Sequence, residues 1–205
     1  MSSFTPPIPP DFQQADWRLK TAKIATEALS PAYLAVLLLV LTGAHRGDGE
    51  GLLWGMAAAV SCGLLPWLVV HSWVRRGKLT DRNIRLRSQR LTPLAVTLAL
   101  GLLSAAMGHA AGAPPDLVAV ITAISAGVAT GATITVWWQM SGHTSMLTST
   151  VLILAQLYGP AILLVTPLIA VGAWSRLALK AHTPAQVCAG TALGTCTALA
   201  FALLR

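Results

Sequence analysis

Residues 116–138, DLVAVITAISAGVATGATITVWW, form an apolar stretch with a single charged side chain, Asp116. A helix that crosses a bilayer needs about 20 mostly apolar residues, so this stretch is long enough to span a membrane. Similar apolar stretches run over residues 29–44, 51–74, 91–111, 144–158, 160–174 and 185–204. We therefore predict an all-α protein, a polytopic membrane bundle of six to seven transmembrane helices.

The composition of the whole chain agrees with this prediction. Of its 205 residues, 55% are hydrophobic and only 10% are charged, which excludes a disordered chain and an ordinary water-soluble domain. Residues 1–27 are rich in proline and polar side chains and lack the pattern of a signal peptide, so we expect a polar tail outside the lipid. Residues 28–205 are expected to form one membrane-embedded domain.

Glycine and proline indicate how these helices turn and pack. The fifth and sixth apolar stretches meet at Gly159-Pro160, where proline cannot continue a helix, so we predict a hairpin of two tilted spans. The pairs Gly127 with Gly131 and Gly190 with Gly194 have the GxxxG spacing that allows helices to approach closely.

Positive charge is concentrated on one side of the predicted topology. The formal net charge is +7, and twelve of the fourteen Lys and Arg residues lie in the tail and in the loops at 75–90 and 175–183. The positive-inside rule makes that side cytoplasmic. Because the cations lie beside apolar spans, membrane lipids or phosphate groups are the expected partners, and nucleic acid is not.

Three short polar segments return to this basic side. The first is the loop that ends at Arg90 and Pro93 and also carries Arg82 and Arg87. The second is Ser141-Gly142-His143, and the third is Ser175-Arg176 followed by His182 and Gln186. Two predicted helices separate each segment from the next, so all three lie at one membrane surface. Imidazoles, guanidinium groups and the free N–H groups of a helix start together suit a phosphate.

These segments resemble the three signatures of the type 2 phosphatidic acid phosphatase superfamily, whose fold is shared with vanadium haloperoxidases. The resemblance covers roughly residues 75–200. Met140-Ser141-Gly142-His143 matches the second motif, Pro-Ser-Gly-His, except for its proline. The third motif has Gln186 in place of its aspartate, and the first matches only in Arg90 and Pro93, with Asn83 in place of its lysine.

The resemblance implies a phosphatase mechanism. His182 would attack phosphorus and form a phosphohistidine, and His143 would protonate the leaving group and later activate water. Phosphate-binding groups would be Arg90, Arg176, Ser141, Gly142 and one of Arg82 and Arg87. The implied reaction is hydrolysis of a phosphate or diphosphate monoester on a lipid or isoprenyl substrate.

No metal and no other cofactor is expected. The chain has no DDxxD-like cluster, because its seven acids are scattered over Asp11, Asp16, Glu27, Asp48, Glu50, Asp81 and Asp116. The cysteines also show no zinc-binding or disulfide spacing.

Several alternatives stay open. Thr183, Pro184 and Gln186 have the spacing of a helix capping box, so Gln186 either caps the helix alone or also orients the His182 ring. The run from Arg75 to Arg90 also suits a lipid-headgroup anchor. The alternative function keeps the anion site without histidine attack, as a prenyl-diphosphate enzyme or a lipid-phosphate binding or transport protein. A purely structural membrane subunit is a third possibility.

Overall fold

The computed structural model describes residues 16–84 and 86–205, and these residues form helices without a strand. The helices are α1 (Trp17–Ala28), α2 (Pro31–Ala44), α3 (Gly49–Ala59), α4 (Leu65–Arg75), α5 (Leu91–Ala110), α6 (Pro115–Trp137), α7 (Gly142–Tyr158), α8 (Pro167–Ala178) and α9 (Pro184–Leu204). Three short turns of other helical types lie between these α-helices: a π turn at Val60–Leu64 and 3₁₀ turns at Arg87–Gln89 and Pro160–Val165.

Six helical stretches within the described residues are long and apolar enough to cross a membrane. They are Trp17–Ala44, Gly49–Arg75, Arg87–Ala110, Pro115–Trp137, Pro160–Ala178 and Pro184–Leu204. Large apolar side chains on their outer faces are exposed, which is the arrangement that lipid contact favours. The prediction of an all-α, multi-pass membrane protein is therefore confirmed at this level.

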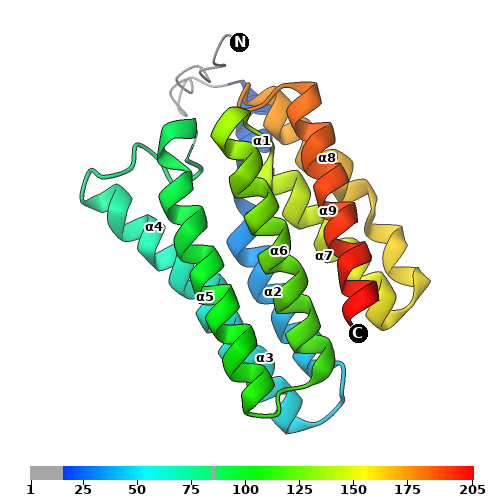
Figure 1. Cartoon of the computed structure of the whole chain (residues 1–205). Coiled ribbons are helices and arrows are strands. Elements are labelled where there is room, and N and C mark those ends of the chain that lie inside the picture. The colour runs from blue at the N-terminus through cyan, green and yellow to red at the C-terminus, as the bar shows by residue number, and fades with distance from the viewer. Residues whose placement is uncertain (1–15, 85) are drawn as a thin grey trace.

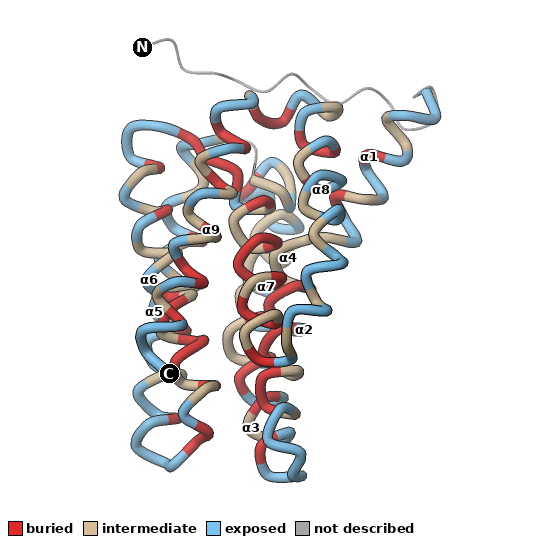
Figure 2. Tube along the Cα trace, turned by 90° about the vertical axis from the view of Figure 1, so that its right-hand side faces the viewer, coloured by how far each residue is buried: buried red, intermediate tan, exposed pale blue. Residues whose placement is uncertain are grey.

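The central helix of the bundle is α7. It has only 17 residues, but nine of them are buried, and it packs against α2 on one side and α9 on the other. Figure 2 shows this buried helix between its neighbours. The main apolar core, which includes Leu38, Leu117, Ile153 and Phe201, joins α7 to α2, α6 and α9. Polar site residues can therefore lie at the bundle's end without interrupting this core.

Two glycines permit a close contact between α9 and α7. A side chain at Gly190 would collide with the Ser141 carbonyl, and one at Gly194 would collide with the Ser145 carbonyl, so α9 lies directly against α7. The predicted GxxxG contact is thus confirmed for this pair. The turn at Gly159-Pro160 is also confirmed: α7 ends at Tyr158, and Gly159 has a φ of 97°, which glycine adopts without strain. Of the two predicted spans it joins, Pro160–Ala178 is long and apolar enough to cross a membrane, whereas the 17-residue α7 is not among those six stretches.

A π turn interrupts the second span. Between α3 and α4, Gly63 approaches Val36 of α2, and the Ser61 hydroxyl lies 3.0 Å from that of Ser104 on α5. Beyond this turn α4 has no buried residue and contacts α5. In Figure 1 it diverges from α2 toward the edge of the bundle. Such turns bend a helix and re-aim the segment that follows.

The polar segments meet at one end of the bundle. Figure 1 shows α1, the α4–α5 connection, the α6–α7 turn and the α8–α9 turn at this end, which we call the basic end. The opposite end, here the far end, holds the turns around residues 45–48, 111–114 and 159. Of the predicted polar tail, residues 17–27 belong to α1, which packs on α8, while residues 1–15 lie outside the described residues.

Candidate active site

The end of α8 places Arg176 and His182 near one another. The N–H of Ala181 donates to the Arg176 carbonyl at 3.0 Å, and the N–H of Lys180 donates to the Leu177 carbonyl at 2.9 Å. This pair of bonds is the Schellman arrangement that closes a helix. Lys180 adopts a φ of 49°, in the left-handed region where glycine is preferred. The chain thus reverses within a few residues, and Arg176 and His182 are both buried.

A capping box starts α9 directly after His182. The Thr183 N–H donates to Gln186 Oε1 at 3.1 Å, and the Gln186 N–H donates to Thr183 Oγ1 at 3.4 Å. The predicted capping role of Gln186 is confirmed. An additional role in orienting the His182 ring stays a prediction.

The Ser-Gly-His segment is fastened to the start of α9. The Ser141 N–H donates to the Gln186 carbonyl at 3.0 Å, and Thr144 Oγ1 donates to the Val187 carbonyl at 3.2 Å. Ser141 is fully buried, and its hydroxyl accepts the Thr144 N–H at the start of α7. Gly142 is exposed at that helix start. The second and third segments, about 40 residues apart in sequence, are therefore joined by one backbone–backbone and one side-chain–backbone hydrogen bond.

Arg90 connects the first segment to the second. Its Nη1 donates to the Met140 carbonyl at 3.0 Å, directly before Ser141, and its Nε donates to the Ile84 carbonyl at 2.7 Å. Asp81 lies close enough to act on the Arg90 charge. Arg90 thereby ties the basic loop to the start of α7.

The two alternative loop cations lie farther out. Arg87 is exposed and donates from Nη1 to the Val136 carbonyl near the end of α6, at 3.0 Å. Arg82 is also exposed. Both lie at the basic end, so each stays a candidate to replace the lysine of the first motif.

Three cationic or imidazole side chains converge on His143. Arg176, His182 and Arg90 all lie near enough to act on it electrostatically. The Nε2 atom of His143 is buried, and no hydrogen-bonding group among residues 16–84 and 86–205 reaches it. The structure thus brings together Arg90, His143, Arg176 and His182, one or two from each predicted segment.

No sequence pattern predicted that α1 contributes a residue to the site. Thr26 is buried, donates from Oγ1 to Ser175 Oγ at 2.9 Å and accepts a hydrogen bond from Arg176 Nη1 at 3.4 Å. The available signal was weak: Ala22 and Thr26 are uncharged and one turn apart, in a helix that carries four charged side chains.

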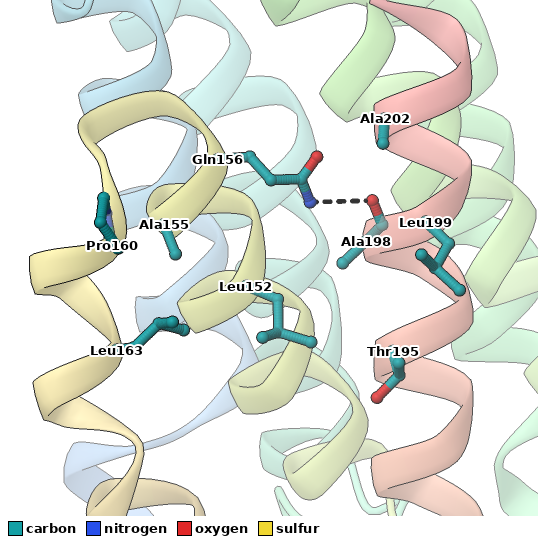
Figure 3. A pocket seen from close by; sticks show the side chains of 9 residues that line it. All are labelled: Leu152, Ala155, Gln156, Pro160, Leu163, Thr195, Ala198, Leu199 and Ala202. Carbon is teal, nitrogen blue, oxygen red and sulfur yellow. Dashed lines mark hydrogen bonds between the residues drawn. The ribbon is translucent and has the colours of Figure 1, made fainter.

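Two apolar grooves lie away from these side chains. The first, of about 430 Å³, lies between α7, the Pro160–Val165 turn and α9, and Figure 3 shows Leu152, Leu163 and Leu199 in its wall. The second, of about 360 Å³, lies between α2, α7 and α8. Its lining includes Ala28 and Leu29, which follow Thr26 by two and three residues. The end of this groove that is nearer the basic end therefore lies next to α1.

In the described part of the chain, no three carboxylate, imidazole or thiol groups lie close enough together to bind a metal ion.

In comparisons with protein-family models, curated proteins and solved structures, no match was found. The fold and the site define a multi-pass helical membrane protein with a cationic, histidine-containing cluster at its basic end.

Proposed function

We propose that this protein is a metal-independent phosphohydrolase, which removes phosphate from a lipid or isoprenyl phosphate or diphosphate through a phosphohistidine. The observation that carries this proposal is the convergence of Arg90, Arg176 and His182 on His143. The buried Nε2 atom of His143 adds support, because no hydrogen-bonding group of the described residues reaches it and such an atom is costly to bury. A phosphate group bound among these side chains would give it a hydrogen-bond partner.

The reaction would proceed in two steps. A neutral His182 nitrogen attacks phosphorus, and the bond from phosphorus to the leaving oxygen breaks. His143, which the negative charge of the bound phosphate would hold in its protonated form despite burial and the nearby cations, donates its proton to that oxygen. In the second step neutral His143 takes a proton from water, whose oxygen attacks phosphorus. The N–P bond then breaks, and His182 returns to its neutral form.

The charge of the phosphoryl oxygens would be met by Arg90 and Arg176 and by the N–H groups at the start of α7. Gly142 begins that helix, where the helix dipole favours an anion. Ser141 caps the helix start, and its N–H donates to the Gln186 carbonyl, so it would act on the phosphate by holding this start in place. Arg82 or Arg87 would complete the set. The expected loss on removing a group that stabilises such a transition state is about 10²- to 10³-fold in kcat.

The lipid nature of the substrate is supported by the position of the cluster. It lies at the end of a bundle with exposed leucines, and the groove lined by Leu34, Leu37 and Leu168 begins beside α1. An acyl or isoprenyl chain in such a groove would leave its phosphate at the basic end.

The alternative function receives support from Gln186. Its side-chain oxygen is engaged in the capping box, and an amide brings no negative charge to His182. A site with less activation of the nucleophile would suit a lipid-phosphate binding or transport protein, or an enzyme that ionises an allylic diphosphate.

Phosphate release from detergent-solubilised protein separates these functions. Phosphatidic acid, a lipid diphosphate and farnesyl diphosphate would serve as substrates. We expect release that vanadate inhibits, because vanadate adopts the five-coordinate geometry of phosphoryl transfer, and that EDTA leaves unchanged. Loss of activity in EDTA with recovery in magnesium would contradict the mechanism and favour the prenyl-diphosphate alternative.

We further propose that the basic end is cytoplasmic, in a cell membrane. Trp17, Trp137 and Trp174 are exposed toward this end, as in an aromatic belt at a membrane interface. Single cysteines at Asn83 and Gly47 should react with a membrane-impermeant reagent from opposite sides of oriented membranes. Labelling of both from the same side would contradict the topology.

A further inference from the structure

Thr26 differs from most other threonines of this protein in its hydrogen bonding. Threonine in a helix commonly donates to the carbonyl four residues earlier, as Thr21, Thr42 and Thr135 do here. Thr26 instead donates to Ser175 Oγ on α8, 149 positions away in sequence. It is 2% exposed, on a helix with no other buried residue except Ala22. Its hydroxyl therefore serves a contact between two distant segments.

The direction of these hydrogen bonds is fixed. Ser175 Oγ donates to the Gly172 carbonyl at 2.7 Å, so it accepts the Thr26 hydroxyl proton. A lone pair of Thr26 Oγ1 is then directed to Arg176 Nη1, at 3.4 Å. This last bond is long, and its strength depends on Thr26 being held by Ser175.

The position of Arg176 makes this contact relevant to the site. Its side chain is 1% exposed and acts electrostatically on His143, so the guanidinium group lies between α1 and the imidazoles. A flexible arginine side chain can adopt several rotamers, and a hydrogen bond at one edge of the guanidinium restricts them.

We infer that Thr26 is a positioning residue, which holds the Arg176 guanidinium in register with His143 and His182. This inference rests on the proposed function, in which Arg176 binds the transferring phosphoryl group. The helix α1 thereby becomes part of the site, although it precedes the first polar segment, the loop with Arg82 and Arg90, by about 60 residues in sequence.

Replacement of Thr26 by valine tests the inference, because valine keeps the shape and removes the hydroxyl. We expect kcat to fall about tenfold, as for a lost hydrogen bond to a charged group, with a smaller change in KM. Vanadate affinity should fall by a similar factor, since vanadate resembles the transition state. Thr26→Ser, which restores the hydroxyl, should recover activity to within about twofold of wild type.

Thr21→Val is the matched control, since Thr21 lies on the exposed side of the same helix and bonds only within it. It should leave kcat and vanadate affinity unchanged. If Thr26→Val cannot be purified as folded protein, Thr26→Ala makes the same test, because it only removes atoms.

Two results would overturn this inference but not the proposed function. The first is a Thr26→Val protein with the kcat and vanadate affinity of the wild type. The second is an equal loss of kcat in Thr26→Ser and Thr26→Val, which would mean that the hydroxyl is not responsible. A wild-type protein that neither releases phosphate nor binds vanadate would overturn the proposed function, and this inference with it. The two failures are therefore distinguishable.

Discussion

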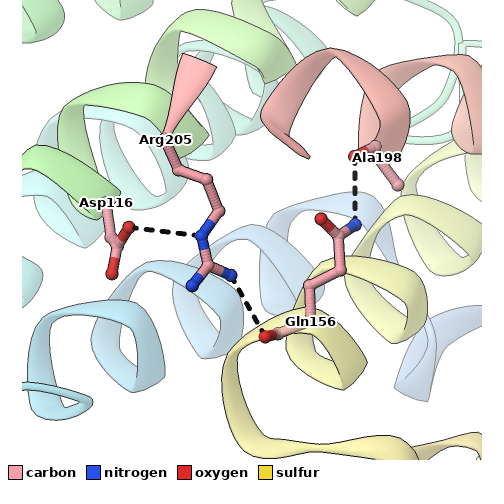
Figure 4. Close-up of polar contacts among 4 residues, drawn as sticks. All are labelled: Asp116, Gln156, Ala198 and Arg205. Atoms are coloured by element: carbon pink, nitrogen blue, oxygen red, sulfur yellow. Dashed lines mark hydrogen bonds and ion pairs between the residues drawn. The ribbon is translucent and has the colours of Figure 1, made fainter. Parts of the chain in front are cut away.

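The two ends of the bundle use arginine in different ways. At the far end Arg205 donates to the Gln156 carbonyl at 3.1 Å and lies 3.9 Å from an Asp116 carboxylate oxygen, while the Gln156 side chain donates to the Ala198 carbonyl (Figure 4). These contacts join α9 to α6 and α7. The ion pair is partly exposed to solvent, where such pairs contribute little to stability.

At the basic end, Arg176 is buried beside two imidazoles and a threonine hydroxyl. A buried guanidinium costs far more to desolvate than an exposed one. The comparison teaches that Arg205 fastens helices at the far end, whereas we propose that Arg176 binds an anion at the basic end. The following predictions test this difference.

The largest effect is expected for the histidines. His182→Ala should abolish turnover, because it removes the nucleophile, and an acid-labile phosphohistidine should be trapped with labelled substrate only when His182 is present. His45→Ala at the far end, where the exposed ring contacts Tyr158 edge-on at 5.0 Å, should keep activity. Phosphate release by His182→Ala would refute the nucleophile assignment.

The arginines should separate next. Arg176→Gln should lower kcat by about 10²- to 10³-fold, because it removes a charge from the transition state. Arg205→Gln should keep kcat and lower stability by no more than about 1 kcal/mol, since only a partly exposed ion pair is lost. Steady-state kinetics and thermal unfolding in detergent measure both. Equal kinetic defects in the two variants would remove the distinction between the ends.

A smaller effect, of opposite sign, is expected at Gln186. Gln186→Asp should raise kcat by up to about tenfold, since a carboxylate there stabilises His182 as imidazolium and also suits a helix start. Gln186→Asn is the matched control, because it shortens the side chain without adding charge and should give no gain. A fall in kcat in both variants would indicate that the capping box outweighs the charge.

The smallest effect concerns the backbone. Among the described residues, those with positive φ at the far end are all glycines, Gly47, Gly112 and Gly159, whereas the basic end has Ile84 and Lys180 in that region besides Gly77. Lys180→Gly should relieve strain and raise stability by about 1 kcal/mol or less, because glycine also gains entropy in the unfolded state. Thermal unfolding should show a slightly higher midpoint, and a lower one would contradict the strain.

The sequence predicted the features that depend on local chemistry. Apolar length predicted the spans, Gly159-Pro160 predicted the turn, Gly190 with Gly194 predicted a close helix contact, and Thr183 to Gln186 predicted a capping box. Even the convergence of Arg90, His143 and His182 followed from counting membrane crossings. Each of these depends on neighbours in sequence or on the two-sided geometry of a bilayer.

What the sequence could not predict depends on contacts between distant segments. Thr26 lies in a stretch whose polarity suggested a solvated tail, and only its packing on α8 shows that it is buried. Similarly, Arg82, Arg87 and Arg90 are alike as cations, and only the structure shows that Arg90 reaches the Met140 carbonyl. Side-chain direction at a helix end is set by tertiary contacts rather than by residue type.

The π turn at Val60–Leu64 has a consequence for how this chain tolerates changes in length. A π turn accommodates one more residue than the same turn of α-helix, and one residue corresponds to about 100° of rotation. Deleting a single residue there would convert α3 and α4 into one regular helix while Trp67, His71 and Arg75 kept their faces, because the π turn already accommodates the extra residue. Deleting a residue within α4 instead would turn the residues that follow it by about 100°. A relative of this chain that lacks the extra residue of the π turn would therefore present the same face of α4 beside the basic end, on a straighter second span.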